Sequence, residues 1–463
     1  MKTCILGGGP GGLTAGYTLA EKDEKVVVIE KDSKVGGLSK TVDFKGYKFD
    51  LGGHRYWSKS DLINNFVKKL MGDELIFVNR ISRIYFNGKY FNYPLKPLNA
   101  MFGMGIFKSI SIFLDYLLVK LSDKFNKRKE ENFEDWIVNR FGKTMFDLYF
   151  RDYTEKVWGI KCNEISAEWA SQRIKGMSLT EAVKNAIFKK KDGPKTLVDQ
   201  FMYPKLGIGR ISDRMAEEIA KNNDLILNSE VVSIKHDNKD ILSAKISDGT
   251  EIEADQFISS IPITQLVGIL NPDVPKEVID AAGRLTYRGI VLVNLLTTKE
   301  EMTNDTWMYI QDKDIPFGRM QQPKNWSKYL VKDNKCSLIL EYFSTKGDEI
   351  WNKTDKDLID YTIKYLEKIK FIKAEEITDG FVIKISKAYP VYTLNYKEDL
   401  KILMDYLKRF KNLQLVGRYG TFKYNNMDHS LEMGIKAAEN IMGANHNLEE
   451  IGSEKEYLEV RNK

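Results

Sequence analysis

The chain has 463 residues, of which 43% are hydrophobic and 29% charged, the balance of a globular protein long enough for two intertwined domains. The net charge of +6 is spread over many lysines and glutamates without a dense basic stripe. This argues against a nucleic-acid partner and leaves room for a positively lined cleft for an anionic small molecule. The three cysteines, Cys4, Cys162 and Cys336, are odd in number and far apart. We therefore expect reduced thiols in the cytoplasm and neither a disulfide framework nor a metal site.

The first elements of the chain form a βαβ unit. The apolar pattern predicts a buried strand at residues 2–6, a helix at residues 11–21 and a second buried strand at residues 25–30. The opening is rich in glycine and lacks the leucine-rich core of a signal peptide, so no signal peptide is expected. Cys4 lies in the first strand and is expected to be a small buried apolar side chain.

The turn of this unit carries a dinucleotide fingerprint. Gly7, Gly9 and Gly12 form a G-x-G-x-x-G run, and such glycines let a tight turn bring a pyrophosphate onto a helix N-terminus. Glu30 follows at the end of the second strand, where a carboxylate can accept hydrogen bonds from ribose hydroxyl groups. The position between a strand and a helix, together with this acid, predicts a nucleotide site.

The most apolar run of the chain covers residues 101–121. Lys108 and Asp115 interrupt it, so it is shorter than an uncharged membrane span. A packed helix is expected, and the alternative is a helix that lies on a membrane surface, because the basic run KFNKRK follows at residues 124–129.

The rest of the chain alternates between helical and strand-rich stretches. Residues 62–190 are predicted to be largely helical, and residues 189–195 (KKKDGPK) to form a loop. An amphipathic helix is expected after residue 209, followed by three strands with hairpin turns at Asp237-Asn238 and Asp248-Gly249. Further strands are predicted at residues 289–342 and 413–417, before a closing helix and a polar tail.

Several stretches resemble the flavin amine oxidase superfamily. KDSKVGGLSKT, with Gly36 and Gly37, resembles the glycine pair and threonine that follow the ribose-binding acid there, and GYKFDLGGHRYW adds a second pair, Gly52 and Gly53. The strand SEVVSIKHD resembles the one whose backbone reads the adenine, which points to Val232. Only one dinucleotide fingerprint is found, so the resemblance implies FAD without a separate NAD domain.

A more specific resemblance lies at residues 417–441. The run GRYGTFKYNNMDHSLEMGIKAAENI looks like the flavin-proximal signature of UDP-galactopyranose mutases. DLGGHRYWS resembles the mutase loop that places Gly-Gly-His beside the flavin. YTEKVWGIKCNEISAEWASQRI resembles the segment that leads to the nucleotide-binding arginine, and AYPVYTLNY resembles the Tyr-Pro segment that faces the substrate.

The resemblance implies an α/β fold. Its Rossmann-like FAD-binding domain would consist of three layers, two sheets and one layer of helices (ββα). This domain would be interleaved with a helical region and a mainly antiparallel substrate sheet. The implied divisions are an FAD-binding domain at 1–61, 203–265 and 408–445, a helical substrate or cap region at 62–202, a substrate sheet at 266–407 and a polar tail at 446–463. The implied cofactor residues are Gly7, Gly9, Gly12, Glu30, Lys31, Gly37, Leu38, Gly52, Gly53, His54, Val232, Gly417, Arg418, Met427 and Asp428.

Two of the four histidines fall in flavin-side motifs. His54 follows the second glycine pair and is a candidate catalytic residue that hydrogen-bonds near the reactive edge of the flavin. A satisfied structural histidine is the alternative. His429 is expected to be structural, because Asp428, His429 and Ser430 could cap the closing helix.

Arginine and tyrosine side chains are the candidates for the substrate. Arg418, also a candidate catalytic residue, and Arg173 could pair with a sugar-nucleotide diphosphate, since guanidinium groups bind phosphate bidentately, and a structural salt bridge is the alternative for each. The remaining candidates are Tyr424 and Asn426 for a phosphate, and Tyr389 and Tyr392 for the sugar pocket or for plain packing. The resemblance implies a further arginine in the middle sheet, which the sequence does not place: Arg288 in LTYRGIVLV is the nearest basic residue but does not have the spacing of the mutase arginine.

The resemblance implies a mutase of nucleotide sugars, active in polysaccharide biosynthesis. Reduced flavin N5 attacks the anomeric carbon and displaces the nucleotide, and the sugar recloses as a furanose without net redox change. The reduced flavin implies NAD(P)H or another external reductant, and the oligomeric state is left open. The first alternative is an FAD-dependent oxidoreductase that resembles amine oxidases or protoporphyrinogen oxidases, and the second is a non-enzymatic interaction protein stabilised by FAD.

Overall fold

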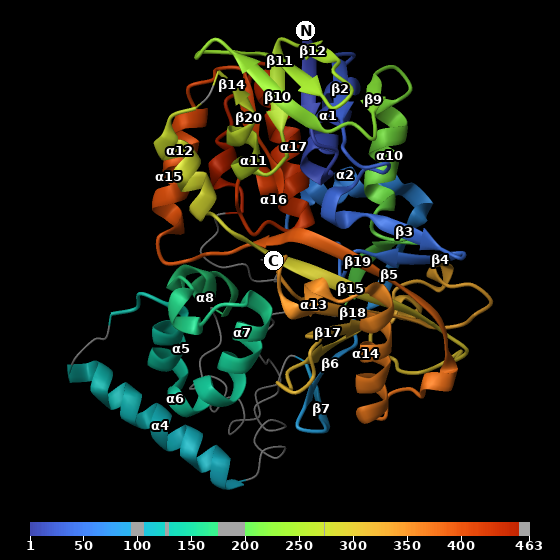
Figure 1. The fold of residues 1–463 in the computed structure, drawn as a ribbon, viewed down its shortest axis with the longest axis vertical. Coiled ribbons are helices and arrows are strands. Elements are labelled where there is room, and N and C mark those ends of the chain that lie inside the picture. Colours follow the sequence, from blue (N-terminus) through green and yellow to red (C-terminus); the bar gives the residue numbers. More distant parts are fainter. Residues whose placement is uncertain (94–105, 126–128, 175–199, 273, 453–463) are drawn as a thin grey trace.

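The structure is a computed structural model that describes residues 1–93, 106–125, 129–174, 200–272 and 274–452. Figure 1 shows the nucleotide-binding part at the top, with the N-terminus, a helical region at the lower left and a sheet-rich region at the lower right. The top part combines elements from the beginning, the middle and the end of the chain, so the expected interleaving is present.

A parallel five-stranded sheet forms the centre of the nucleotide-binding part, in the order β20-β13-β1-β2-β9. Its strands are β1 (Lys2–Leu6), β2 (Lys25–Ile29), β9 (Asp224–Ile226), β13 (Gln256–Ser259) and β20 (Leu413–Leu415). One face is covered by helices α1 (Pro10–Ala20), α10 (Arg210–Ile219) and α17 (Met427–Ile441). The other face is covered by the sheet of β10 (Val231–His236), β11 (Ile241–Ile246), β12 (Glu251–Glu253) and β14 (Leu270–Asn271).

Alternation along the central strands produces these layers. In β1 and β2, Ile5 and Val28 pack toward the helices, whereas Cys4 and Val27 pack toward the second sheet. Successive strand residues point to opposite faces, so a continuously apolar strand is buried on both sides. The three-layer ββα arrangement is confirmed, and Cys4 is fully buried as expected.

A seven-stranded sheet forms the sheet-rich region, in the order β19-β15-β18-β17-β16-β6-β7, antiparallel except for the β16–β6 pair. Its strands are β6 (Ser82–Phe86), β7 (Lys89–Asn92), β15 (Tyr287–Thr297), β16 (Trp307–Ile310), β17 (Arg319–Gln321), β18 (Ser337–Phe343) and β19 (Ile377–Pro390). Helices α13 (Glu349–Asn352) and α14 (Asp355–Lys368) pack on one face, and the hairpin of β3 (Thr41–Phe44) and β4 (Tyr47–Asp50) packs on the other. The mainly antiparallel sheet is therefore present.

The prediction of a largely helical stretch at residues 62–190 is wrong for residues 75–92. β5 (Leu75–Asn79) pairs with β8 (Gln200–Pro204), and β6 and β7 join the seven-stranded sheet. Asn87 and Gly88 turn the β6–β7 hairpin with φ angles of 50° and 73°, the left-handed geometry that Asn-Gly favours. The Asn-Gly pair between two runs rich in aromatic and β-branched residues, RIYF and KYFNY, was the overlooked hairpin signal.

The remaining described helices either form the helical region of Figure 1 or pack on the nucleotide-binding part. They are α2 (Asp61–Met71), α4 (Ile106–Phe125), α5 (Phe133–Phe141), α6 (Lys143–Met145), α7 (Arg151–Trp158) and α8 (Ala167–Ile174), then α11 (Ile263–Gly268), α12 (Lys276–Arg284), α15 (Tyr396–Leu407) and α16 (Gly417–Gly420). The predicted loop at residues 189–195 lies outside the described residues. Among the described helices, none has the length and apolar character needed to cross a bilayer.

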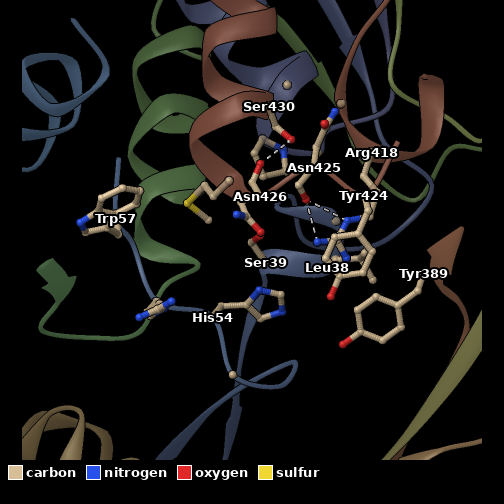
Figure 2. Close-up of a pocket in the computed structure, with 18 of the residues that line it drawn as sticks. Leu38, Ser39, His54, Trp57, Tyr389, Arg418, Tyr424, Asn425, Asn426 and Ser430 are labelled. Atoms are coloured by element: carbon tan, nitrogen blue, oxygen red, sulfur yellow. Dashed lines mark hydrogen bonds between the residues drawn. The ribbon is translucent and has the colours of Figure 1, made fainter. Parts of the chain in front are cut away.

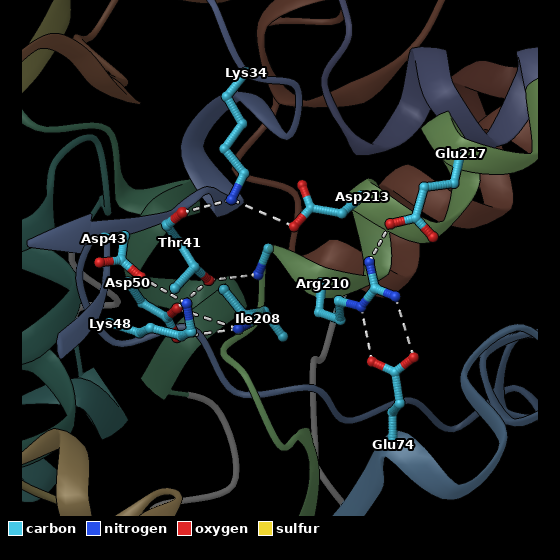
Figure 3. A network of polar contacts seen from close by, with 11 residues as sticks. Lys34, Thr41, Asp43, Lys48, Asp50, Glu74, Ile208, Arg210, Asp213 and Glu217 are labelled. Carbon is cyan, nitrogen blue, oxygen red and sulfur yellow. Dashed lines mark hydrogen bonds and ion pairs between the residues drawn. The ribbon is translucent and has the colours of Figure 1, made fainter. Parts of the chain in front are cut away.

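A buried carboxylate fastens the β3–β4 hairpin to the segment that enters α10, as Figure 3 shows. The Asp50 carboxylate accepts hydrogen bonds from the Thr41 hydroxyl at 2.6 Å, from the Ile208 N–H at 3.1 Å and from the Tyr203 hydroxyl. The Gly209 N–H donates to Thr41 at 2.8 Å and closes the network. The network thus anchors the end of β4, from which the chain continues to His54, to the segment before α10.

Candidate functional site

A cavity of about 310 Å³ opens where the nucleotide-binding part meets the seven-stranded sheet. Figure 2 shows Arg418, Tyr389 and Tyr424 on one side of it and Trp57 on the other, with His54 between them. The cavity lining includes many of the predicted residues: Gly9, Gly37, Leu38, Gly53, His54, Tyr389, Gly417, Arg418, Tyr424, Asn426 and Met427.

The glycine turn brings the N-terminus of α1 to this cavity. Gly7 has a φ of 98°, and a Cβ on Gly12 would lie 2.3 Å from the Gly7 carbonyl oxygen, so neither position accepts a side chain without strain. The Glu30 carboxylate accepts the Gly8 N–H at 2.8 Å and thereby fixes the turn beside the end of β2. The turn and the acid thus have the arrangement that a flavin dinucleotide requires.

The N-terminus of α17 meets the cavity beside that of α1. The two helices pack closely at Gly434. A Cβ at this position would lie only 2.4 Å from the Gly11 carbonyl oxygen, so the contact requires glycine. Asn426 is the N-cap of α17, and its N–H donates to His429 Nδ1 at 3.4 Å. The cap expected from Asp428, His429 and Ser430 is corrected in part: His429 contributes, but Asp428 lies in the first turn, where burial raises the pKa of its carboxyl. Two adjacent helix N-termini make the cavity attractive to anions.

His54 enters the cavity as a neutral hydrogen-bond acceptor. Burial, with the nearby charges of Arg418 and Arg319, lowers the pKa of His54 to about 4. His54 Nε2 lies 3.1 Å from the Leu51 carbonyl oxygen, which can only accept, so Nε2 carries the proton and Nδ1 is left as an acceptor. The side chain can therefore receive a hydrogen bond at neutral pH but has no spare proton to donate.

Arg418 keeps its positive charge for a ligand. Its Nε and Nη2 donate to the Asn425 carbonyl at 3.0 and 2.7 Å, and its Nη1 donates to the Ala388 carbonyl at 3.1 Å. The guanidinium also lies 4.9 Å from the ring centre of Tyr424. Within the described ranges no carboxylate forms an ion pair with it, so the structural salt bridge considered for Arg418 is not observed there. Backbone carbonyls hold the group in place without neutralising it.

Tyrosine rings form the wall next to Arg418. Tyr389 and Tyr424 stack with ring centres 5.4 Å apart and an interplanar angle of 11°, and both line the cavity. The prediction that Tyr392 also lines the pocket is wrong. Its ring is buried against Tyr396 at 4.3 Å, and its hydroxyl accepts the Tyr424 N–H at 2.9 Å. Tyr392 therefore supports the wall from behind.

The middle-sheet arginine at the cavity is Arg319, not Arg288. Arg288 donates to the Val157 carbonyl at 3.1 Å and pairs with Asp348 at 3.0 Å, away from the cavity lining. Arg319 lies on the three-residue strand β17 and lines the cavity, with its Nη2 2.9 Å from a carboxylate oxygen of the buried Glu341. A strand this short leaves little periodicity to detect, which is why the sequence did not single out Arg319.

Glu341 connects this arginine to the loop of the second glycine pair. Its Oε1 accepts the Gly53 N–H at 3.0 Å and also the Gln321 side-chain amide. A Cβ on Gly52, which has a φ of 103°, would lie 3.3 Å from the same oxygen. One buried carboxylate thus positions Arg319 and the loop that carries His54.

Other predicted cofactor residues lie outside the cavity lining. Gly7, Gly12, Glu30 and Gly52 shape the backbone around it, as described above. The Lys31 side chain is exposed and pairs with Asp32 at 3.6 Å, and Val232 is a bulged position of β10 between the paired residues Val231 and Ser233. Arg173 belongs to α8, and its side chain lies outside the described part of the chain.

An aromatic group at the cavity was not predicted. Its members are Trp57, Tyr93, Trp307, Tyr309 and Trp326. Arg55, from the HRYW run after the second glycine pair, also lines the cavity, with its guanidinium 5.7 Å from the Trp307 ring centre. The HRYW run was the available clue for Arg55 and Trp57. Trp307 and Tyr309 lie on β16, Tyr93 follows β7 and Trp326 follows β17, and only the folded sheet brings these segments together.

Comparison with known proteins extends these observations. Residues 10–442 match the family of flavin containing amine oxidoreductases. A Klebsiella pneumoniae protein assigned as a UDP-galactopyranose mutase is 22% identical over 96% of each chain. A crystal structure of reduced UDP-galactopyranose mutase superposes with a TM-score of 0.83 at 22% identity, covering 98% of this chain and 96% of that one. A putrescine oxidase bound to putrescine superposes with a TM-score of 0.66 at 15% identity, covering 96% of this chain and 100% of that one.

Proposed function

Because this chain belongs to the flavin-containing amine oxidoreductase family and is a flavoenzyme, we propose that it is an FAD-dependent mutase of nucleotide sugars. The observation that carries this proposal is the charge of the cavity. Arg55 and Arg418 line it beside two helix N-termini, together with Arg319, whose charge is paired with the buried Glu341 behind the lining, and the lining itself contains no Asp or Glu within the described residues. Such a cavity favours the diphosphate of a nucleotide sugar and repels the ammonium group of an amine substrate.

The cofactor residues divide into those that hold the dinucleotide and those that surround the ring. The N-terminus of α1 would bind the pyrophosphate, Glu30 the ribose and the backbone at Val232 the adenine. The segments at Gly37–Leu38, Gly53–His54, Gly417 and Met427 would surround the flavin ring, because these residues line the cavity. When bound and reduced, the flavin supplies a nucleophile for the anomeric carbon, and NAD(P)H or another reductant would maintain that form.

The protein residues would then bind the substrate and stabilise the leaving group. Arg418 and Arg319, with Arg173 from α8, would neutralise the diphosphate as it departs. Tyr389 and Tyr424 would line the sugar, and the aromatic group around Trp307 offers stacking surfaces for a nucleobase. His54, neutral with Nδ1 as an acceptor, would receive a hydrogen bond from a donor on the reduced flavin or on the sugar.

The test is turnover of the chemically reduced protein without oxygen. The protein reduced with dithionite is incubated with UDP-galactopyranose and related nucleotide sugars, and the products are separated by chromatography. We expect a furanose product from the reduced protein and none from the oxidised protein, which is the matched control. Absence of furanose product from every sugar tested would refute the proposal.

The alternative is an FAD-dependent oxidoreductase. The aromatic group at the cavity favours it, since it could also accommodate an apolar ring. Oxygen or dye consumption in proportion to product would identify this activity, because an oxidoreductase passes two electrons per product to an acceptor, whereas a redox-neutral mutase consumes no acceptor.

A further inference from the structure

Helix α4 carries apolar side chains on both of its faces. Ile112, Tyr116 and Val119 point inward and are buried, and α4 packs on α5 and α6. The opposite face exposes a continuous stripe at helical spacing, in which each side chain is 39–66% exposed: Ile110, Phe113, Leu114, Leu117, Leu118 and Leu121. Exposed apolar patches of this kind mark interaction sites in folded proteins.

Charged residues lie within α4 and directly after it in the sequence. Asp115 turns inward, where its Oδ2 accepts the Thr144 N–H at 2.6 Å, so its carboxylate is bound to the protein core. Between Lys120 and Lys129 the sequence has five basic residues and one acidic residue. Glu130 and Glu131, which follow, are paired with Arg140 and Lys129 at 2.5 Å each. With Lys129 paired to Glu131, four basic residues and one acidic residue remain in the stretch from Lys120 to Arg128, which follows the exposed stripe in the sequence.

We propose that α4 docks this protein on the surface of an anionic lipid bilayer. The helix lies at the outer edge of the helical region (Figure 1), so it can lie flat on a planar surface. An apolar stripe inserts at the boundary of the headgroups, and neighbouring lysines attract anionic lipids. None of the described helices could cross a bilayer, so the contact would be peripheral.

A second copy of the chain fits this face less well. A second copy would bring the same basic sequence to the interface, and α4 offers no free carboxylate that the structure describes for such a contact. Like charges at an interface oppose association. An anionic lipid surface carries the charge opposite to that of this basic stretch.

The experiment measures sedimentation of the FAD-loaded full chain with vesicles of phosphatidylcholine, with and without phosphatidylglycerol. We expect binding only to the anionic vesicles, weakened by high salt. Binding should fall on the order of tenfold or more in Leu114→Gln/Leu118→Gln, because less apolar surface is buried, and in Lys120→Gln/Lys124→Gln, because charge is lost. The control is Leu242→Gln/Ile279→Gln, which changes two exposed apolar residues elsewhere and should bind as the unchanged protein does.

Flavin absorbance of each variant reports that its fold is retained, and the lysine variant tests the proposal even if the leucine variant does not fold. Three outcomes would overturn the proposal. The unchanged protein does not bind anionic vesicles, both α4 variants bind them as strongly as the unchanged protein does, or the protein self-associates without lipid and the leucine substitutions abolish that association. The last outcome would identify a second copy as the partner of α4. Mutase turnover is not part of the readout, so failure of this proposal is distinct from failure of the proposed function.

Discussion

In the proposed function, Arg418 is the residue that should contribute most to the binding of a substrate diphosphate. Its contacts are to two backbone carbonyls, so its orientation is fixed while its charge stays available. Arg418→Lys retains the charge but loses the planar fork that bridges two phosphate oxygens. We expect UDP to bind this variant about 10–100-fold more weakly, measured by titration of the flavin absorbance. Arg284→Lys, which alters an exposed arginine paired with Asp399, is the control and should leave UDP affinity unchanged.

Glu341 is a positioning residue, buried beneath the cavity. Its carboxylate receives the Gly53 N–H at 3.0 Å and balances the charge of Arg319 at 2.9 Å. Glu341→Gln leaves the guanidinium buried without an opposite charge, so we expect the free energy of unfolding to fall by about 3 kcal/mol. Urea denaturation measures this change. Glu300→Gln removes an exposed carboxylate and should cost less than about 0.5 kcal/mol, and an equal loss in both variants would contradict the role of Glu341.

Elements are held together by the network of Figure 3, which joins the β3–β4 hairpin to the segment before α10. Burial raises the pKa of Asp50 from 3.8 to about 6, although Thr41, Tyr203 and Ile208 donate to its carboxylate. Between these two values the folded protein holds a proton that the unfolded chain releases. The free energy of unfolding contributed by Asp50 is therefore highest below pH 3.8 and decreases as the pH rises to 6, by about 3 kcal/mol.

Asp50→Asn removes this titration but retains one oxygen for the network. Chemical denaturation of the variant and the unchanged protein at several pH values measures the effect. We expect their difference in unfolding free energy to shift in favour of the variant by about 3 kcal/mol as the pH rises from 4 to 7. A difference independent of pH would show that Asp50 does not titrate in this range.

At the scale of the whole molecule, the cavity lining comes from distant stretches of the chain. It combines the α1 turn, the 37–57 segment, strands of the seven-stranded sheet and the 417–430 segment. A cofactor bound there stabilises only the folded arrangement, by about 4 kcal/mol at a thousandfold excess over its dissociation constant. Removal of FAD should therefore lower the melting temperature by roughly 5–10 °C. Added riboflavin should restore little of this, because it lacks the pyrophosphate that we propose the α1 N-terminus to bind. Equal melting of both forms would contradict the proposed cofactor site.

The sequence by itself determined the local part of this protein. The first strand, the glycine turn, the helix and Glu30 are contiguous, and their chemistry depends on backbone conformations that neighbouring residues impose. The run from Gly417 to Ser430 is likewise contiguous and lines one wall of the cavity, although Ala388 and Tyr389 of β19 help to hold that wall. The spacing of residues within these segments is what predicts their local structure, so the fold and many of the residues that line the cavity were predictable.

Tertiary structure alone decided which distant side chains share the cavity. Arg319 and Trp307 reach it because β17 and β16 lie side by side in the seven-stranded sheet, and strand order is set by packing rather than by local pattern. Tyr389 and Tyr392 lie close in sequence, yet only Tyr389 faces the cavity. The α4 helix is apolar on both faces, so its periodicity could not show which face is buried until α5 and α6 were packed against it.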